Sequence, residues 1–264
     1  MNILRPPTSA QADALAALIG GAERIVAFTG AGVSTECGVP DFRSPDSPWR
    51  QNKPIAYADF LATDAARRET WRRKFTMDDA YAHARPGRGH RALAHLMSIG
   101  KISTIITQNI DNLHLASGAP RERVIELHGN GSYATCLSCG RRYELAVVRA
   151  MFAAEPSAPT CTCGGFIKSA TVAFGQAMPA AAMRAAQVAA LDCDLCLAIG
   201  SSLVVFPAAG FPVLAQRNGA KLVILNGEPT HLDASADLVI HADIGAALAP
   251  FQGDRTRAPV ASAR

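Results

Sequence analysis

Long apolar runs are missing from this 264-residue sequence. Its apolar stretches are interrupted within roughly ten residues, far short of the ~20 that a membrane-spanning helix needs, so the sequence predicts no membrane span. Residues 1–7 also lack the basic-then-apolar layout of a signal peptide, which favours the cytoplasm. Hydrophobic residues make up 49% of the chain and charged residues 18%, a composition that excludes general disorder.

A strong excess of charge is absent as well. The formal net charge is +4, which is too small to indicate a nucleic-acid partner by itself. Arginines do cluster, for example at Arg67-Arg68 and at Arg72-Arg73-Lys74, but acidic residues lie between the clusters and no aromatic ladder accompanies them. We therefore interpret them as solvated helix faces and expect no specific nucleic-acid binding.

The seven cysteines do not suggest a disulfide framework in a cytoplasmic protein. Four of them form two close pairs, Cys136-x2-Cys139 and Cys161-x-Cys163, whose separation is typical of a tetrahedral zinc site. The second pair is tighter than the usual Cys-x2-Cys. Four sulfur ligands leave no open position on the metal, so we expect one structural zinc without a catalytic role. Cys193 and Cys196 run into an apolar strand and are predicted to be buried core thiols.

Strand-like and helix-like segments alternate along the chain, which predicts a parallel sheet with helical crossovers. The length allows one large α/β domain or two smaller ones. Thr8-Ser9-Ala10-Gln11 resembles a capping box and predicts a first helix. Residues 44–84 are expected to form a loop followed by a small helical insertion. Further helices are expected near residues 88–99, 112–117 and 179–191, and strands at 25–29, 102–107, 124–127, 195–199, 221–225 and 238–241.

Small or polar residues follow strand after strand: Gly30, Gln108-Asn109, His128, Gly200-Ser201-Ser202 and Asn226. In open α/β sheets the carboxyl edge of the strands is where ligands bind. Gly30 and Gly32 lack the Cβ atoms that would keep backbone N–H groups away from an anion. A glycine turn that closes an ordinary βα unit fits these residues equally well. The polar, aromatic and cationic cluster Val39-Pro40-Asp41-Phe42-Arg43 favours the ligand site.

Together these motifs resemble the sirtuins, a family of NAD-dependent protein lysine deacylases. The resemblance covers about residues 20–250 and rests on the joint order of several short motifs. They are G-A-G-V-S at 30–34, V-P-D-F-R-S at 39–44, A-R-P-x-x-x-H at 84–90, T-Q-N-I-D at 107–111, E-L-H-G-N at 126–130, the four paired cysteines, F-G-Q at 174–176, G-S-S-L at 200–203, and Asn226.

The resemblance implies one catalytic domain with two lobes. The fold class is α/β: a Rossmann-like parallel sheet forms the large lobe, about residues 9–45, 86–132 and 169–250. The small lobe contains the helical insertion, 46–85, and the zinc ribbon, 133–168. NAD and an acyl-lysine peptide or protein would meet between the lobes, and the peptide would pair with both lobes as an added strand.

Site residues follow from the same resemblance. The pyrophosphate and the adjacent ribose would be held by Gly30, Ala31, Gly32 and Ser34. The adenosine side would be lined by Gly200, Ser201, Ser202, Asn226, Gly227 and Ile244. The nicotinamide would be bordered by Asp41, Phe42, Arg43, Gln108, Asn109 and Asp111. Among these residues, Asn109 would orient the ribose and Asp111 would orient the nicotinamide amide. Val172, Phe174 and Gly175 would form the acyl-lysine channel.

His128 would be the general base. The resemblance implies that the acyl oxygen first attacks the nicotinamide ribose and expels nicotinamide, leaving an alkylimidate. His128 then deprotonates a ribose hydroxyl, which captures the acyl carbon, and water finally releases free lysine and acyl-ADP-ribose. An imidazole that titrates near neutrality suits this task. The other histidines, His83, His90, His95, His114, His231 and His241, are expected to be surface or capping residues.

Two positions depart from the family pattern: Gln176 stands where Glu is usual and Ser169 where Pro is frequent. Both bear on peptide preference more than on catalysis. No Tyr-x-x-Arg pair for acidic acyl groups is found, so acetyl is the first expectation.

Two other functions stay open, a protein mono-ADP-ribosyltransferase that uses the same NAD site and an inactive NAD-responsive adaptor. The sequence does not fix the oligomeric state, and a monomer is compatible with it.

Overall fold

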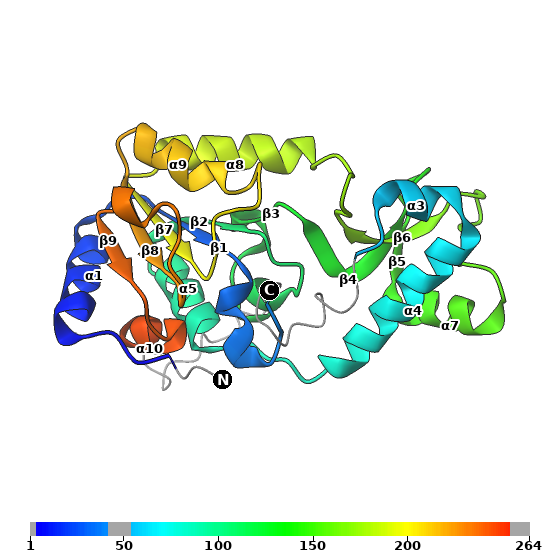
Figure 1. The fold of residues 1–264 in the computed structure, drawn as a ribbon, viewed down its shortest axis with the longest axis horizontal. Helices are drawn as coiled ribbons and strands as arrows, with labels where there is room; N and C mark the ends of the chain where they lie inside the picture. The colour runs from blue at the N-terminus through cyan, green and yellow to red at the C-terminus, as the bar shows by residue number, and fades with distance from the viewer. Residues whose placement is uncertain (1–3, 42–53, 254–264) are drawn as a thin grey trace, which may run out of the picture.

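The structure, a computed structural model, describes residues 4–41 and 54–253. Within these ranges a six-stranded parallel sheet forms the larger part of the molecule, and a three-stranded antiparallel sheet with its own helices forms the smaller part (Figure 1). No helix in the described ranges is long and apolar enough to cross a membrane.

The large sheet has the strand order β3-β2-β1-β7-β8-β9, with every neighbouring pair parallel. Its strands are β1 (Ile25–Thr29), β2 (Ile102–Thr107), β3 (Val124–Glu126), β7 (Leu195–Ile199), β8 (Lys221–Leu225) and β9 (Leu238–Ile240). Each coincides with a predicted strand within one residue, and the predicted parallel sheet is confirmed. The central strands β1 and β7 are buried on both faces, as their continuous apolar composition indicates.

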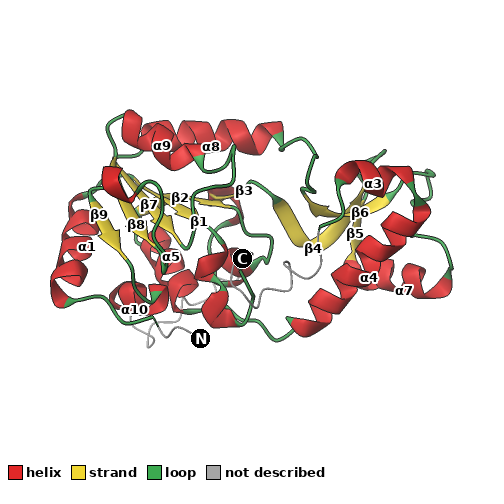
Figure 2. Ribbon diagram, viewed as in Figure 1, coloured by secondary structure: helices red, strands yellow, loops and turns green. Residues whose placement is uncertain are grey.

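Helices cover both faces of this sheet, so the large part has three layers (Figure 2). One face packs against α1 (Ser9–Gly21), α5 (Arg88–Ser98) and α10 (Ile244–Leu248), which share a core with Ile25, Ala27 and Leu197. The other face packs against α8 (Ala180–Asp192) and α9 (Gly210–Arg217), which share a core with Val26, Phe28 and Ala198. Alternate residues of β1 therefore point to opposite layers, as the period of a strand requires.

Local signals in the sequence set the helix ends. Thr8 caps α1 and exchanges hydrogen bonds with Gln11, so the predicted capping box is present. Pro179 precedes α8 and Gly100 follows α5 in the left-handed region. The remaining short elements of this part are η1 (Ala31–Val33), η2 (Thr35–Cys37), α6 (Leu113–Ala116), η3 (Arg121–Arg123), η4 (Asp233–Ser235) and η5 (Ala249–Phe251).

The smaller part joins two segments that are distant in sequence. It contains α3 (Tyr57–Ala62), α4 (Asp64–Ala80), β4 (Gly129–Cys136), β5 (Arg142–Glu144), α7 (Leu145–Ala154) and β6 (Ile167–Thr171). Trp71 and Phe75 of α4 stack on each other and pack against Val148 of α7 and Ile167 of β6. The sequence indicated a helical insertion and a cysteine ribbon, but it did not predict α7, which lies within the ribbon between the two cysteine pairs.

The interpretation of the arginine clusters as solvated was wrong for Arg67, and Lys74 of the second cluster is also largely buried, with a side chain that is 17% exposed. Arg72 is solvent-exposed and pairs with Glu69, whereas Arg67 is buried on the inner side of the same helix. The Arg67 guanidinium donates to the carbonyls of Phe60 and Leu61 and lies 3.9 Å from the centre of the Phe166 ring. An arginine can be buried in this way because its charge is spread over a planar group that packs on aromatic rings.

Candidate active site

The strand order reverses direction between β1 and β7, at the centre of the large sheet. Such a reversal opens a crevice at the carboxyl ends of the strands, because the two flanking connections leave in opposite directions. Gly30 follows β1 and Gly200 follows β7, so the two predicted glycine turns lie side by side at this crevice. The backbone N–H of Gly30 donates to Ile199, and that of Gly32 donates to Gly200.

The glycines are required for a reason that the sequence did not reveal. A Cβ added at Gly30 would lie 2.7 Å from the Gly200 carbonyl oxygen, and one at Gly32 would lie 2.7 Å from the Gly200 Cα. Gly200 itself has a φ of +62°, and its Cβ would lie 2.4 Å from the Val33 nitrogen. The missing side chains therefore let the two turns pack backbone against backbone, which brings two predicted cofactor-binding loops together.

Gly200→Ala is expected to destabilise the protein and to weaken NAD binding. Alanine meets a strained backbone conformation, about 1–2 kcal/mol, and a backbone clash that costs about 1–3 kcal/mol more. Gly100→Ala is the matched control, since Gly100 has a φ of +80° with nothing within 4 Å of its Cβ position. Thermal melts with and without ADP-ribose measure both effects, and equal losses in the two variants would contradict the clash.

A side-chain bridge spans the crevice above β1. Gln108, which follows β2, donates from Nε2 to the Ser201 Oγ at 2.9 Å. The same hydroxyl accepts the backbone N–H of Leu203, a buried residue held at a φ of +59°. A leucine in the left-handed region is strained, and strain of this kind collects at ligand-binding loops. Gln108 and Ser201 are thus brought together as predicted neighbours at one sheet edge.

Asn109, Ser34 and Asp111 form a hydrogen-bonded group beside the glycine turn. Asn109 Nδ2 donates to the Gly30 carbonyl and to Ser34 Oγ, and the Ser34 hydroxyl donates to Asp111 Oδ2 at 2.6 Å. The other Asp111 oxygen accepts the backbone N–H of Leu113. Ser34 is completely buried, and its hydroxyl is hydrogen-bonded to both Asn109 and Asp111.

Two of the histidines that we expected to be surface or capping residues are buried beneath this group. The prediction was wrong for His114, which is 3% exposed. It is confirmed for His90 as a capping residue, because His90 Nδ1 accepts the Gly87 N–H at the start of α5, although the ring is fully buried. His114 Nε2 contacts Thr29 Oγ1, the Thr29 hydroxyl donates to Thr107 Oγ1, and Thr107 accepts the Asn109 N–H. The histidines were missed because their role depends on partners from other strands.

Burial keeps His114 neutral. Loss of hydration, followed by the nearby charge of His90, lowers the pKa of His114 to about 3. The Thr29 hydroxyl donates its only hydrogen to Thr107, so it accepts a hydrogen bond from His114 Nε2. The neutral His114 ring therefore carries its one hydrogen on Nε2. His114 therefore supports the backbone of Asn109 through a chain of hydrogen bonds and carries no charge at neutral pH.

His128 lies at the same edge, just beyond β3. Its Nδ1 is 2.9 Å from the carbonyl oxygen of Gln108, and a carbonyl can only accept. The neutral ring therefore carries its proton on Nδ1 and presents an unprotonated Nε2, the form that a general base needs. Partial burial lowers the pKa of His128 below its usual 6.5, although the Gln108 carbonyl opposes the shift. His128 is consequently neutral at pH 7.

The predicted substrate residues begin next to this histidine. The Val172 N–H donates to the His128 carbonyl, so the end of β6 is joined to the predicted general base. Phe174 is 63% exposed, and Gly175 adopts a φ of +80° at the tip of the loop. Gln176 Oε1 accepts the Ala173 N–H, a bond that a glutamate carboxylate would also make. The substitution of Gln for Glu thus preserves the shape of the loop.

The other predicted cofactor residues lie along the same edge. Asn226 and Ile244 are buried, Ser202 and Gly227 are partly exposed, and Asn226 Nδ2 donates to the Glu228 carbonyl. Ala31 begins η1, and Asp41 is the last described residue before the gap. Phe42 and Arg43 lie outside the described residues.

The four paired cysteines converge on one point in the smaller part. All four sulfurs lie within 4.8 Å of one another, with 3.5 Å between Cys136 and Cys163 and 3.7 Å between Cys139 and Cys161. Sulfurs at about 2.3 Å from a tetrahedral zinc would be about 3.8 Å apart, whereas a disulfide would need about 2.05 Å. The cluster therefore fits one structural zinc, and the tighter Cys-x-Cys pair does not prevent convergence.

The surroundings of the sulfurs also suit a metal. The Cys163 N–H and then the Tyr143 hydroxyl, which donates to Cys161 Sγ at 2.9 Å, lower the pKa of Cys161 to about 6. A Cβ at Gly165 would lie 2.6 Å from Cys136 Sγ, so only glycine leaves room there. At Cys161 the thiolate form that zinc binds is thus favoured.

The buried thiols were predicted correctly. Cys193 is 7% exposed and Cys196 2% exposed, and burial raises the pKa of Cys193 to about 11. Cys37 is half-buried, and its sulfur lies 3.8 Å from His90 Nδ1. Burial, followed by the charge of Glu36, raises the pKa of Cys37 to about 11, so this thiol is protonated at neutral pH.

Comparisons with known proteins agree with this geometry. Residues 30–207 match the model of the Sir2 family. An NAD-dependent protein deacetylase of Rhodopseudomonas palustris is 55% identical over 96% of this chain and 100% of its own length. NAD-dependent protein deacetylase 1 of Bradyrhizobium diazoefficiens is 53% identical over 96% of this chain and 100% of its own length.

Solved structures show the same fold with ligands. A structure of Sir2 with a p53 peptide and NAD+ has a TM-score of 0.78 and 35% identity, and the match covers 90% of this chain and 94% of that one. A second, bound to a propionylated peptide, has a TM-score of 0.79 and 34% identity, with 88% of this chain and 93% of that one covered.

Proposed function

Since this chain belongs to the Sir2 family, we propose that its sheet-edge site performs the NAD-dependent deacylation of protein lysines, with His128 as the general base. The enzyme consumes NAD and releases nicotinamide, free lysine and O-acyl-ADP-ribose. The observation that supports the role of His128 most directly is its tautomer: Nδ1 faces the Gln108 carbonyl, so Nε2 is free to take a proton.

The residues at the switch point would hold the cofactor. When bound, NAD supplies the ADP-ribosyl group that receives the acyl oxygen, with nicotinamide as the leaving group. The pyrophosphate would be held by the adjoining turns at Gly30–Gly32 and Gly200. The adenosine side would be lined by Ser201 and Asn226. The nicotinamide side would be lined by Asp41, Phe42, Arg43, Gln108 and Asp111. Asn109 would orient the ribose. Its amide Nδ2 already donates to the Gly30 carbonyl and to Ser34 Oγ, and these two hydrogen bonds fix the position of the side chain.

The substrate would be an acyl-lysine in an extended peptide. Val172, Phe174 and Gly175 would line its path to His128, because the Val172 backbone is bonded to the His128 carbonyl. We propose acetyl as the first acyl group to test. The described residues around the channel include no Tyr-x-x-Arg pair that would receive an acidic acyl group.

We further propose a single catalytic unit that acts in the cytoplasm. The large lobe would comprise about residues 9–45, 86–132 and 169–250, and the small lobe 46–85 and 133–168. Free, unpaired cysteines support a reducing compartment. We propose a monomer, and the proposed reaction requires no nucleic acid and no membrane.

The pH dependence of kcat/KM follows from the sign of the His128 shift. Neutral imidazole is the active form, and burial lowers its pKa below 6.5. We expect kcat/KM for the acyl-peptide to fall at acid pH as His128 becomes protonated, with the midpoint of this limb below pH 6.5. An acid limb whose midpoint lies above pH 7 would contradict the assignment. Nicotinamide exchange into NAD, which precedes the base step, should lack this limb.

One experiment distinguishes the proposed reaction from its alternatives. The protein is mixed with NAD labelled in the ADP-ribose group and with an acetyl-lysine peptide, and the products are separated by mass. Acetyl-ADP-ribose together with free lysine supports the deacylase. Label retained on protein without peptide turnover supports the ADP-ribosyltransferase. Cofactor binding without release of nicotinamide from NAD, whichever acyl-peptide is added, would leave only the adaptor.

A further inference from the structure

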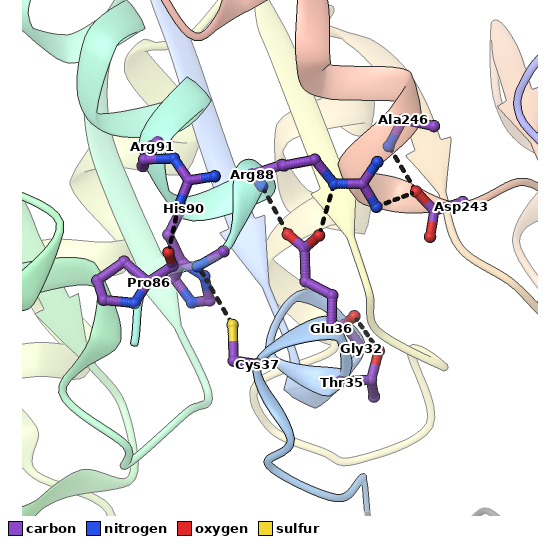
Figure 3. Close-up of polar contacts among 12 residues, drawn as sticks. Gly32, Thr35, Glu36, Cys37, Pro86, Arg88, His90, Arg91, Asp243 and Ala246 are labelled. Carbon is purple, nitrogen blue, oxygen red and sulfur yellow. Dashed lines mark hydrogen bonds and ion pairs between the residues drawn. The ribbon is translucent and has the colours of Figure 1, made fainter. Parts of the chain in front are cut away.

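We propose that Glu36, with Arg88 and Asp243, is a positioning residue that fixes the cofactor-binding turn and sets the affinity for NAD. This inference rests on the proposed function, because it concerns the same cofactor site. Figure 3 shows the Glu36 side chain reaching from the turn toward Arg88, which in turn reaches Asp243. None of the three side chains is assigned a contact with the reacting atoms.

The turn needs such an anchor at its far end. From Gly30 to Gly38 the backbone forms two single turns, η1 and η2, and most of its hydrogen bonds link residues three apart. Gly32 holds the near end to Gly200, and Ser34 holds the middle to Asp111. At η2 the described contacts with the rest of the protein come from two side chains, Cys37 on His90 and Glu36 on α5.

Glu36 makes both of its contacts through one carboxylate. Oε2 pairs with Arg88 Nε at 2.8 Å, and Oε1 accepts the Gly89 N–H at 3.0 Å. Arg88 and Gly89 are the first two residues of α5, so the carboxylate satisfies an unpaired amide at a helix N-terminus, where a negative charge is favoured. The Glu36 side chain is only 20% exposed, which limits screening of the pair by solvent.

Two glycines shape the slot that the carboxylate occupies. A Cβ at Gly87 would lie 2.3 Å from Glu36 Oε1, and one at Gly245 would lie 2.4 Å from Oε2. Neither glycine has a backbone conformation that itself demands glycine. Their small size is therefore explained by the carboxylate between them.

Arg88 extends the connection to the adenosine side. Its Nη2 pairs with Asp243 Oδ1 at 2.8 Å, and the same oxygen caps α10 by accepting the Ala246 N–H. The first residue of α10 is Ile244, predicted to line the adenosine, and a small cavity is lined by Gly32, Glu36 and Ile244. One charge network thus sets the relative position of the pyrophosphate turn and the adenosine wall, while His128 and Val172 lie on other elements.

The test measures cofactor and peptide parameters separately in the full-length protein. Glu36→Gln keeps the size of the side chain and removes its charge. We expect the KM for NAD and the Kd for ADP-ribose, from calorimetry, to rise about five- to twentyfold, while kcat and the KM for the acetyl-peptide stay within about twofold. Arg88→Gln should give the same split, and the double variant should be no worse than either single one, because all three remove one network.

Asp79→Asn is the control, since it breaks an ion pair with Arg149 in the small part, far from the turn in sequence. It should leave all four parameters unchanged. Unchanged NAD and ADP-ribose parameters in Glu36→Gln and Arg88→Gln would overturn the proposal, as would an equal loss in peptide KM and kcat. A wild-type protein that binds no ADP-ribose or does not deacylate would instead defeat the proposed function.

Discussion

Substitution of His128 by alanine is expected to abolish net deacylation while leaving most of the NAD affinity in place. A positioned general base contributes about 10²–10⁴-fold to a rate, and here the ring presents its unprotonated Nε2 at the sheet edge. The ring is not needed to hold the pyrophosphate turn, which is anchored by Gly200, Asp111 and α5. We therefore expect kcat to fall at least a hundredfold by this estimate of general-base catalysis, with the Kd for ADP-ribose changed by less than about threefold.

The order of the steps sharpens this experiment. Expulsion of nicotinamide precedes the proton transfer, so exchange of labelled nicotinamide into NAD should continue in His128→Ala in the presence of acetyl-peptide. His83→Ala is a suitable control, because His83 is exposed and is assigned no role in the site. Wild-type turnover in His128→Ala would refute the base assignment. Loss of ADP-ribose binding together with turnover would show that the ring is structural.

Much of the large sheet was predictable because its signals are local. A buried parallel strand is a short apolar run, and a helix end is set by a cap or a glycine within a few residues, as at Thr8 and Gly100. The helix α10 and the strands β4 and β6 were not anticipated. The helix α10 and the strand β6 are short, β4 mixes small, polar and apolar residues, and all three are held by partners far along the chain, such as Arg88 for the cap of α10.

The residues of the site could be predicted from the sequence, but the contacts between them could not. Polar residues after successive strands had to meet at one edge, because parallel strands place all their carboxyl ends together. The sequence could not show that Gly30 and Gly32 are small to admit Gly200, nor that Glu36 fills a slot between Gly87 and Gly245. Buried His114 was taken for a surface residue, since a hydrogen bond to Thr29 across 85 positions leaves no local pattern.

Removal of the zinc ligands should collapse the small part of the molecule. Its buried core consists of Trp71, Phe75, Ala134, Cys136, Val148, Cys161 and Ile167, and two of these are themselves predicted ligands. So small a core does not stabilise a three-stranded sheet alone, whereas zinc bound by cysteines contributes about 10–16 kcal/mol to the folding of small zinc domains. Cys139 and Cys163 are exposed, so their replacement creates no core cavity.

Cys139→Ala and Cys163→Ala are therefore expected to lower Tm by more than about 10 °C, since each kcal/mol shifts the Tm of a protein of this size by about 2–4 °C. A chelator should do the same to the wild type, and elemental analysis should find close to one zinc per chain before treatment. Ser138→Ala is the matched control, because Ser138 is an exposed residue of the same turn but is not a ligand.

A metal-free wild type with an unchanged Tm would refute the structural role. If both exposed-cysteine variants kept their zinc, the four-sulfur site would be wrong, whereas loss of zinc together with loss of peptide turnover would show that the small part must be folded for the substrate channel to form.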